Sequence, residues 1–195
     1  MVVDDHDKIL AIAFVSDDTA VALCTSKGRV RVWEISTGRD IRSWQCDECI
    51  SRIKLAAFSP DGTLIVTSPL SRKTVSVCST TTGKLISALQ SRSLLAGIAI
   101  SSNGRVAAIS TRTLTIQIWD GHTGLSIADP VVFEDYIGSI ELSSLAISPD
   151  GTVLAVGLSS GKIEVYDLNT QTRATFSVDN FFLPAHSRFR LMDCM

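Results

Sequence analysis

The same two-part pattern recurs four times along this chain of 195 residues. An apolar run ends at a tight polar turn and a second apolar run follows, as in "AAFSPDGTLIVTS" (Ala56 to Ser68) and "LAISPDGTVLAVG" (Leu145 to Gly157). The apolar residues before the turns recur at intervals of 44, 42 and 47 residues: Phe14, Phe58, Ile100 and Ile147. The residues that close each unit recur at intervals of 45, 41 and 47: Trp33, Cys78, Trp119 and Tyr166. Two anchors with a common period indicate units that must stack on one another to bury a core.

Each unit carries signals for four short strands. Three of the first turns contain Asp-Gly or Asn-Gly, which tolerate the left-handed backbone of tight hairpins, and the first unit has Asp17-Asp18 instead. Runs such as "RVRVW" (Arg29 to Trp33) then alternate with the period of two that is typical of a strand. A second turn ("STGR", "TTGK", "HTGL") precedes a short last strand, and the fourth unit replaces its glycine with Gln171. We therefore predict an all-β fold, a partial β-propeller of about four four-stranded antiparallel blades. The predicted second strands are centred near Val21, Val66, Ala107 and Leu154.

Composition and charge limit the possible environments and partners. Hydrophobic residues make up 45% of the chain and charged residues 19%, which is enough apolar material for a packed core. The formal net charge is −2 and the chain has no long Lys/Arg run, so we expect neither nucleic acid nor a membrane as partner. The start "MVVDDHDK" lacks the pattern of a signal peptide, and apolar runs such as Ile9 to Val15 are too short to cross a bilayer. We expect an intracellular protein, cytoplasmic or nuclear, without a signal peptide or a transmembrane segment.

These motifs resemble the repeats of the WD-repeat family. The resemblance is carried by "FSPDGT" and "ISPDGT", by the strand ends "VRVWE" and "IQIWD", and by the "STG", "TTG" and "HTG" turns. It predicts a WD-repeat-like propeller segment at residues 8–176, with units at about 8–44, 52–89, 94–128 and 141–176, and an irregular C-terminal tail at 177–195. WD propellers usually have about seven or eight blades. Four units therefore imply a fragment of a larger propeller, an arc that pairs with another arc, or an open arc with exposed apolar faces. The fragment is the favoured interpretation.

The units depart from the family pattern in two respects. The third unit alone ends in Trp-Asp, at Trp119-Asp120, whereas the first ends in Trp33-Glu34. The family's Gly-His dipeptide, and the Asp that hydrogen-bonds its histidine, are missing from the corresponding positions of every unit. The resemblance thus implies that stability rests mainly on apolar packing. We expect Trp33 and Trp119 to be largely buried between adjacent blades.

We predict no catalytic, cofactor or metal site. Cys46 and Cys49 form a CxxC, but a zinc site needs further ligands, and the three histidines are isolated in sequence. Two interpretations stay open, a loop between the first two units or capture of a distant histidine by the fold, and the loop is preferred. The Asp of each turn and the pair Asp17-Asp18 are explained by turn chemistry. The sequence contains no phosphate-binding loop or nucleophile elbow.

The predicted function is that of a non-catalytic scaffold for protein–protein interaction, because loops on a rigid support commonly carry function. The resemblance implies that partners dock on the second-to-third strand loops and on the loops between blades. Carried onto this chain, the candidate partner-facing residues are Lys27, Arg52, Arg72, Lys73, Arg112, Asp135 and Ser160. The expected partners are other proteins, further blades of a longer chain or a second copy. One alternative is a truncated or decayed propeller fragment without an independent role. A quinoprotein- or lactonase-type enzyme is disfavoured, because first strands such as "ILAIAF" offer almost no ligands.

Overall fold

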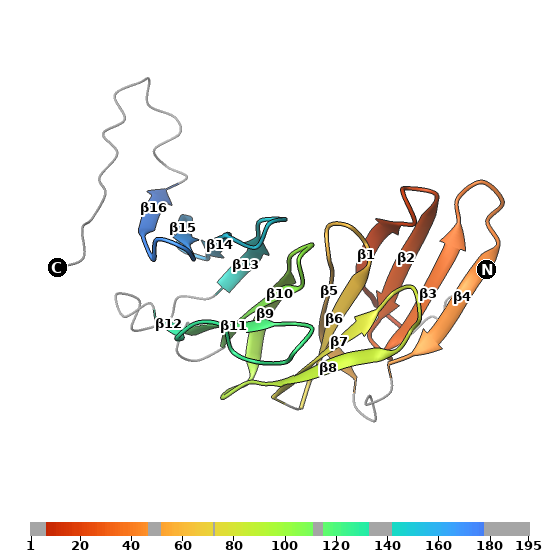
Figure 1. Ribbon diagram of the computed structural model, residues 1–195, viewed down its shortest axis with the longest axis horizontal. Helices are drawn as coiled ribbons and strands as arrows, with labels where there is room; N and C mark the ends of the chain where they lie inside the picture. Colours follow the sequence, from red (N-terminus) through yellow and green to blue (C-terminus); the bar gives the residue numbers. More distant parts are fainter. Residues whose placement is uncertain (1–6, 47–51, 72, 111–114, 133–141, 178–195) are drawn as a thin grey trace, which may run out of the picture.

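The structure, a computed structural model, describes residues 7–46, 52–71, 73–110, 115–132 and 142–177. These residues form four four-stranded antiparallel sheets that follow one another along the chain (Figure 1). The strands of the first two sheets are β1 (Ile9–Val15), β2 (Ala20–Thr25), β3 (Arg29–Glu34), β4 (Asp40–Gln45), β5 (Ile53–Phe58), β6 (Leu64–Pro69), β7 (Thr74–Ser79) and β8 (Leu85–Gln90). Those of the last two are β9 (Leu95–Ile100), β10 (Arg105–Ser110), β11 (Thr115–Asp120), β12 (Val131–Val132), β13 (Leu142–Ile147), β14 (Val153–Leu158), β15 (Lys162–Asp167) and β16 (Arg173–Ser177). Within these ranges no helix is long and apolar enough to cross a bilayer.

The all-β prediction is confirmed, and the predicted second strands coincide with β2, β6, β10 and β14. Each sheet keeps the order of its strands in the sequence, so within a sheet each strand pairs with the one before it. The third sheet differs from the others in its last strand, because β12 has only two residues and lies beyond residue 128. Pro130 immediately precedes it, and a proline cannot donate a hydrogen bond to a strand ladder.

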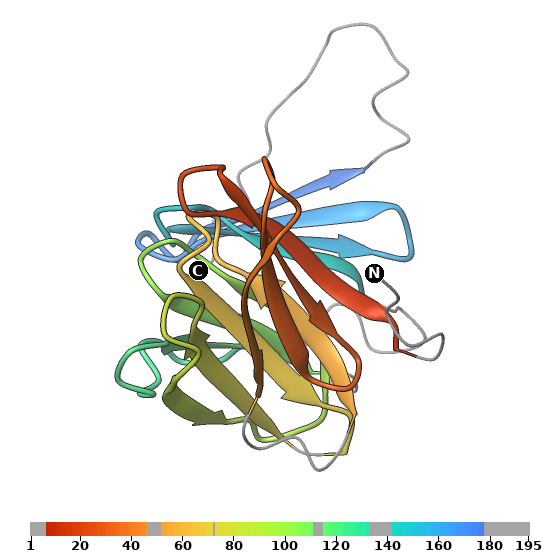
Figure 2. The ribbon, with the colours of Figure 1, turned by 90° about the vertical axis from the view of Figure 1, so that its right-hand side faces the viewer.

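The four sheets stack side by side into an open arc. The first strands meet in succession, β1 against β5, β5 against β9 and β9 against β13. The first and fourth sheets therefore lie at opposite ends of the arc (Figure 1), and a view turned by 90° looks onto the first sheet with the second behind it (Figure 2). The arrangement is that of consecutive blades of a propeller.

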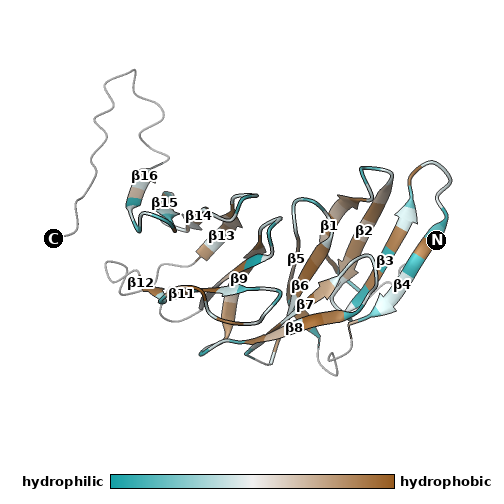
Figure 3. Cartoon of the chain, viewed as in Figure 1, coloured by the Kyte–Doolittle hydropathy of each residue, from teal (hydrophilic) through white to brown (hydrophobic). Residues whose placement is uncertain are grey.

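Apolar side chains fill the three interfaces between successive sheets. Strands of all four sheets carry apolar stretches (Figure 3). The first interface buries Cys24, Val30, Cys46, Ile65 and Cys78. The second buries Val66, Val75, Val77, Leu89, Ile98, Ile100, Val106 and Trp119. The third buries Ala107, Ile116, Ile118, Leu154, Val156 and Leu158. The hydrophobic core thus consists of three separate layers, each shared by two sheets.

The two faces of each sheet are occupied by different positions of the repeat. In the second sheet Ile65 pairs with Cys78, and both pack toward the first sheet. Val66 pairs with Val77, and both pack toward the third sheet. We call these the leading face and the trailing face of a sheet. Adjacent residues of a strand point to opposite sides, so one strand supplies both faces.

The leading face of the first sheet is apolar and exposed. Phe14 pairs with Val21, which pairs with Trp33, so these three share the face that points away from the second sheet. Phe14 is 61% exposed and Ile12 is 66% exposed. Trp33 is only half-buried, so the expectation that it is buried between two blades was wrong. Trp119, at the equivalent position of the third sheet, is 4% exposed and packs against the second sheet as expected.

Candidate interaction surface

The strand order gives the arc two ends with different loops. Each sheet begins and finishes at the end that holds the second-to-third strand loops and the segments linking successive sheets, which we call the linker end. The opposite end holds the first-to-second and third-to-fourth strand turns, and we call it the turn end. The linker end is where the resemblance places partner-binding loops.

Four of the predicted partner-facing residues lie exposed at the linker end. Lys27 is in the β2–β3 loop and Ser160 is in the β14–β15 loop. Arg52 immediately precedes β5, and Lys73 precedes β7. The other three predicted residues, Arg72, Arg112 and Asp135, lie outside the described residues. The assignment of all seven to a partner surface stays a prediction.

Hydrogen bonds hold the loops of the linker end to one another. The backbone N–H of Lys27 donates to Asp7 Oδ1 at 2.9 Å, and the Ser26 hydroxyl donates to the same oxygen at 3.1 Å. The N–H of Ile53 donates to the carbonyl of Ser26 at 2.8 Å, which joins the first sheet to the second. These bonds fix the loop positions relative to the sheets, as a rigid binding surface requires.

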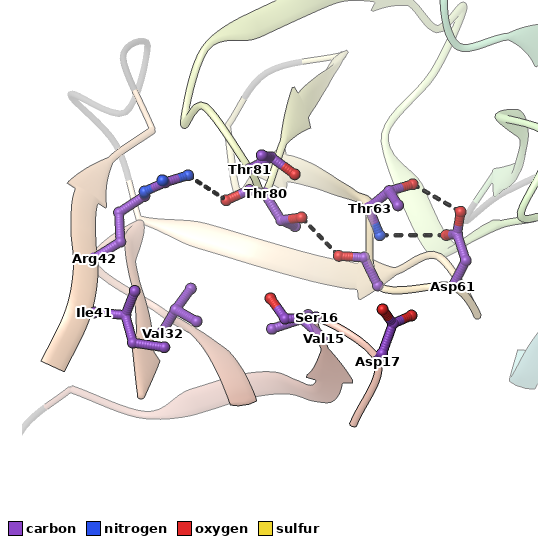
Figure 4. Close-up of a pocket in the computed structure, with 11 residues that line it drawn as sticks. Val15, Ser16, Asp17, Val32, Ile41, Arg42, Asp61, Thr63, Thr80 and Thr81 are labelled. Carbon is purple, nitrogen blue, oxygen red and sulfur yellow. Dashed lines mark hydrogen bonds between the residues drawn. The ribbon is translucent and has the colours of Figure 1, made fainter. Parts of the chain in front are cut away.

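The turn end contains a shallow pocket of about 220 Å³ between the first and second sheets (Figure 4). Arg42 Nη1 donates to the carbonyl of Thr80 at 3.4 Å, and the Thr80 hydroxyl donates to the carbonyl of Gly62 at 2.6 Å. A Cβ at Gly62 would lie 2.6 Å from the carbonyl oxygen of Phe14, so only glycine allows the second sheet to approach this closely. The contacts that line this pocket are those that join two blades.

A serine hydroxyl organises the first turn in three of the four units. Ser59 Oγ donates to Asp61 Oδ1 at 2.6 Å and accepts from the N–H of Leu64 at 2.9 Å. Ser148 makes the same bonds to Asp150 and Val153, and Ser101 contacts Asn103 in the third unit. The turn-forming role of Asp, Asn and Gly was predicted from the sequence, whereas the role of the serine was not. The recurring spacing Ser-x-Asp/Asn-Gly was the signal that could have revealed it.

These hydrogen bonds lower the pKa of the turn carboxylates. The Ser148 hydroxyl, followed by the N–H of Thr152, holds the pKa of Asp150 below its ordinary value of 3.8. Partial burial raises the pKa of Asp61, but hydrogen bonds from Ser59 and Thr63 outweigh it, and the pKa is lowered overall. Both carboxylates are therefore ionised turn caps rather than proton donors at neutral pH.

The aspartate that follows the closing aromatic residue caps the second turn. Asp120 Oδ1 accepts from the N–H groups of His122 and Thr123 at 2.8 and 2.9 Å. Asp167 Oδ1 accepts from Asn169 and Thr170 at the same two distances. The N–H of Thr123 contributes most to the lowered pKa of Asp120, and that of Thr170 to the lowered pKa of Asp167. The Asp of the repeat's closing dipeptide thus has a structural role in this chain.

In the described part of the chain, no group of three or more His, Cys, Asp and Glu side chains is placed to hold a metal ion. Cys46 is buried in the first interface beside Cys24, Val30 and Cys78. Its partner in the CxxC, Cys49, lies outside the described residues. The surroundings of Cys46 are those of a thiol that packs as a small apolar side chain.

The comparisons with known proteins agree with this geometry. The family described as "WD domain, G-beta repeat" matches residues 134–167, which include most of the fourth unit. A solved structure, "Structure of U3-55K", superposes with a TM-score of 0.71 at 12% identity over 89% of this chain and 53% of that chain. The chain resembles WD-repeat proteins in the sequence of one repeat and in its fold. The arc is therefore a row of propeller-like blades, one of which matches the WD-repeat pattern.

A curated relative from Saccharomyces cerevisiae (strain ATCC 204508 / S288c) is similar to most of this chain. It is the "U3 small nucleolar RNA-associated protein 12", 20% identical over 169 residues. The match covers 80% of this chain and 17% of the yeast protein. The chain thus spans about half of the solved structure it matches and less than a fifth of the yeast relative.

Proposed function

We propose that this chain is a non-catalytic scaffold for protein–protein interaction, and that partners bind at its linker end. The observation that carries the proposal is the arrangement of exposed loops on four stacked sheets. Lys27, Arg52, Lys73 and Ser160 all lie exposed at one end of a support built from three apolar interfaces. Loops held by a rigid framework supply a binding surface without a large ordering cost.

The comparisons support a role within a larger assembly. The chain spans only part of each protein it matches, so we propose that further blades, in the same chain or in another, complete the propeller. The name of the yeast relative associates that protein with U3 small nucleolar RNA. On that basis we propose a nuclear location. The match to a WD repeat and the propeller-like fold support a binding role.

Cross-linking in cells tests the proposed binding end. A tagged chain with Lys27→Glu and Ser160→Tyr changes the linker end, and one with Arg39→Glu and Ser36→Tyr makes matched changes at exposed positions of the turn end. We expect proteins cross-linked to the unchanged chain to be lost from the first variant and kept by the second. Unchanged thermal unfolding of both variants is the control for folding. Equal cross-linking of both variants would place the partner surface elsewhere and overturn the proposal.

A further inference from the structure

The middle of the chain carries an unusual excess of positive charge. Between Cys49 and Trp119 the sequence has eight Lys and Arg residues, and Asp61 is its only acidic residue. Asp61 lies in the turn between β5 and β6, at the turn end. The second sheet and the segments that flank it are therefore basic within a chain whose formal net charge is −2. This local excess is hidden in the composition of the whole chain.

Hydrogen bonds gather four of these cations at the linker end of the second and third sheets. The N–H of Leu70 donates to the carbonyl of Arg52 at 2.8 Å, which places the end of β6 beside the start of β5. Lys73 Nζ donates to the carbonyl of Arg92 at 3.1 Å, and Lys54 Nζ donates to the carbonyl of Leu95 at 2.8 Å. Arg52, Lys54, Lys73 and Arg92 are all exposed.

Two leucines lie exposed among these cations. Leu70 is 56% exposed and is joined to Arg52 by the backbone bond just described. Leu94 is 44% exposed and immediately precedes Leu95, whose carbonyl accepts from Lys54. We call the six residues the basic–leucine surface: Arg52, Lys54, Leu70, Lys73, Arg92 and Leu94.

We propose that the basic–leucine surface binds an acidic protein segment that also carries apolar side chains. Exposed cations attract carboxylates over a Debye length and orient the encounter, whereas the affinity of a peptide depends on apolar contacts that exclude water. The two leucines supply such contacts between the cations. The inference rests on the proposed function and adds the chemical class of the partner.

The same features favour a protein segment over a nucleic acid. Single-stranded nucleic acid is usually held by aromatic side chains on which bases stack, together with cations along the backbone. None of the six residues is aromatic. Leucine has no flat face for a base, whereas it packs readily against the apolar side chains of a peptide.

Fluorescence anisotropy with the full chain tests the proposal. The probe is a short labelled peptide in which glutamates surround a pair of leucines. One reference peptide has glutamine for glutamate, one has serine for leucine, and a labelled oligouridine RNA is the nucleic-acid probe. We expect the acidic leucine peptide to bind most tightly and to weaken when salt is raised.

Variants of the chain locate the binding. Arg52→Glu with Arg92→Glu should raise the Kd of the acidic peptide about tenfold, because two attractions become repulsions. The matched control, Arg39→Glu with Lys84→Glu, makes the same change in net charge at exposed turn-end positions and should leave the Kd unchanged. Leu70→Ser with Leu94→Ser should weaken the acidic leucine peptide by about fivefold and leave the serine peptide unaffected.

Each other outcome contradicts the proposal. Tighter binding of the RNA, insensitive to the leucine changes, would make the surface a nucleic-acid site. Equal Kd values in the two charge-reversal variants would mean that the linker-end cations take no part. If no probe binds to the folded chain, the inference that the partner is an acidic segment is wrong. The cross-linking of the Lys27 and Ser160 variant then decides separately whether the linker end is an interaction surface.

Discussion

Gln171 shows how one residue can depart from the repeat while the fold is kept. Its backbone is left-handed, with φ at 58°, and the equivalent residues of the other units are Gly38, Gly83 and Gly124. A side chain costs roughly 1 kcal/mol in this region, because its Cβ crowds the backbone. The fourth unit therefore bears strain at a turn that glycine would make without it.

Gln171→Gly should raise the free energy of unfolding by up to about 1 kcal/mol, less the extra freedom that glycine has in the unfolded chain. Urea denaturation measures the change. Gly38→Gln is the matched reverse test. At Gly38 φ is 67° and a Cβ would meet no atom within 4 Å, so the strain of the left-handed backbone is the only cost that the structure predicts for this substitution. A loss of stability in the Gln171 variant would show that the glutamine side chain makes a contact that outweighs the strain.

The lowered pKa values of the turn aspartates predict acid sensitivity. The pKa values of Asp61, Asp120, Asp150 and Asp167 lie below 3.8 in the folded chain. The contribution of these ionised aspartates to the free energy of unfolding is therefore complete above that pH, and it is lost as the pH falls through their pKa values in the folded chain. Stability measured by urea denaturation should drop progressively below about pH 4.

In an NMR titration, Ser148→Ala should raise the pKa of Asp150 toward 3.8, and an unchanged pKa would exclude the Ser148 hydroxyl as the main cause of the lowered value.

At the level of single residues, the sequence predicted those positions whose residue types are dictated by backbone geometry. Asp-Gly and Asn-Gly marked three turns correctly, because few residue types accept left-handed φ. The serine hydroxyls were missed, because serine occurs in many settings and its hydrogen bonds become visible only when the turn is folded. The basic–leucine surface was missed for a different reason, since its members come from separate segments that strand pairing within the second sheet and its contact with β9 bring together.

Strands and sheets followed from the period of the sequence. Alternation fixes which residues share a face, and this is why the second strands were placed correctly. Burial of a face was harder to predict, because it depends on the neighbouring sheet. Trp33 and Trp119 occupy equivalent positions, yet one is half-buried on a leading face and the other is enclosed between sheets.

The two tryptophans give a matched test of interface packing. Trp119→Ala should lower the free energy of unfolding by about 3–5 kcal/mol, because it removes a large buried side chain from the second interface and leaves a cavity there. Trp33→Ala should cost about 1–2 kcal/mol, since this ring packs on its own sheet, with the Arg31 guanidinium 5.1 Å from its centroid. Chemical denaturation compares the two variants. Equal losses would mean that the leading face of the first sheet is covered in solution.

On the scale of the whole molecule, the described residues leave two sheet faces without a neighbouring sheet. Ile12 and Phe14 are exposed on the first sheet, and Phe176, 38% exposed, pairs with Ile163 on the trailing face of the fourth. Exposed apolar faces favour association. The isolated chain should therefore form oligomers at micromolar concentration, as measured by sedimentation.

Ile12→Glu with Phe14→Glu should reduce this association, because it places two carboxylates on an apolar contact. Ile35→Glu with Leu125→Glu is the control, since these exposed side chains lie in turns away from the faces. A monomer that binds no hydrophobic dye would contradict the prediction and would indicate that both faces are covered.

The distinction between leading and trailing faces gives the arc a direction. In all three interfaces a trailing face meets a leading face. The two uncovered faces are one of each kind, so they are complements rather than copies. Added blades, whether from the same polypeptide or from another, therefore join head to tail, and a two-fold symmetric contact between like faces does not continue the pattern. Such a heterologous contact has two outcomes: a ring when the rotations sum to a full turn, and an open filament when they do not.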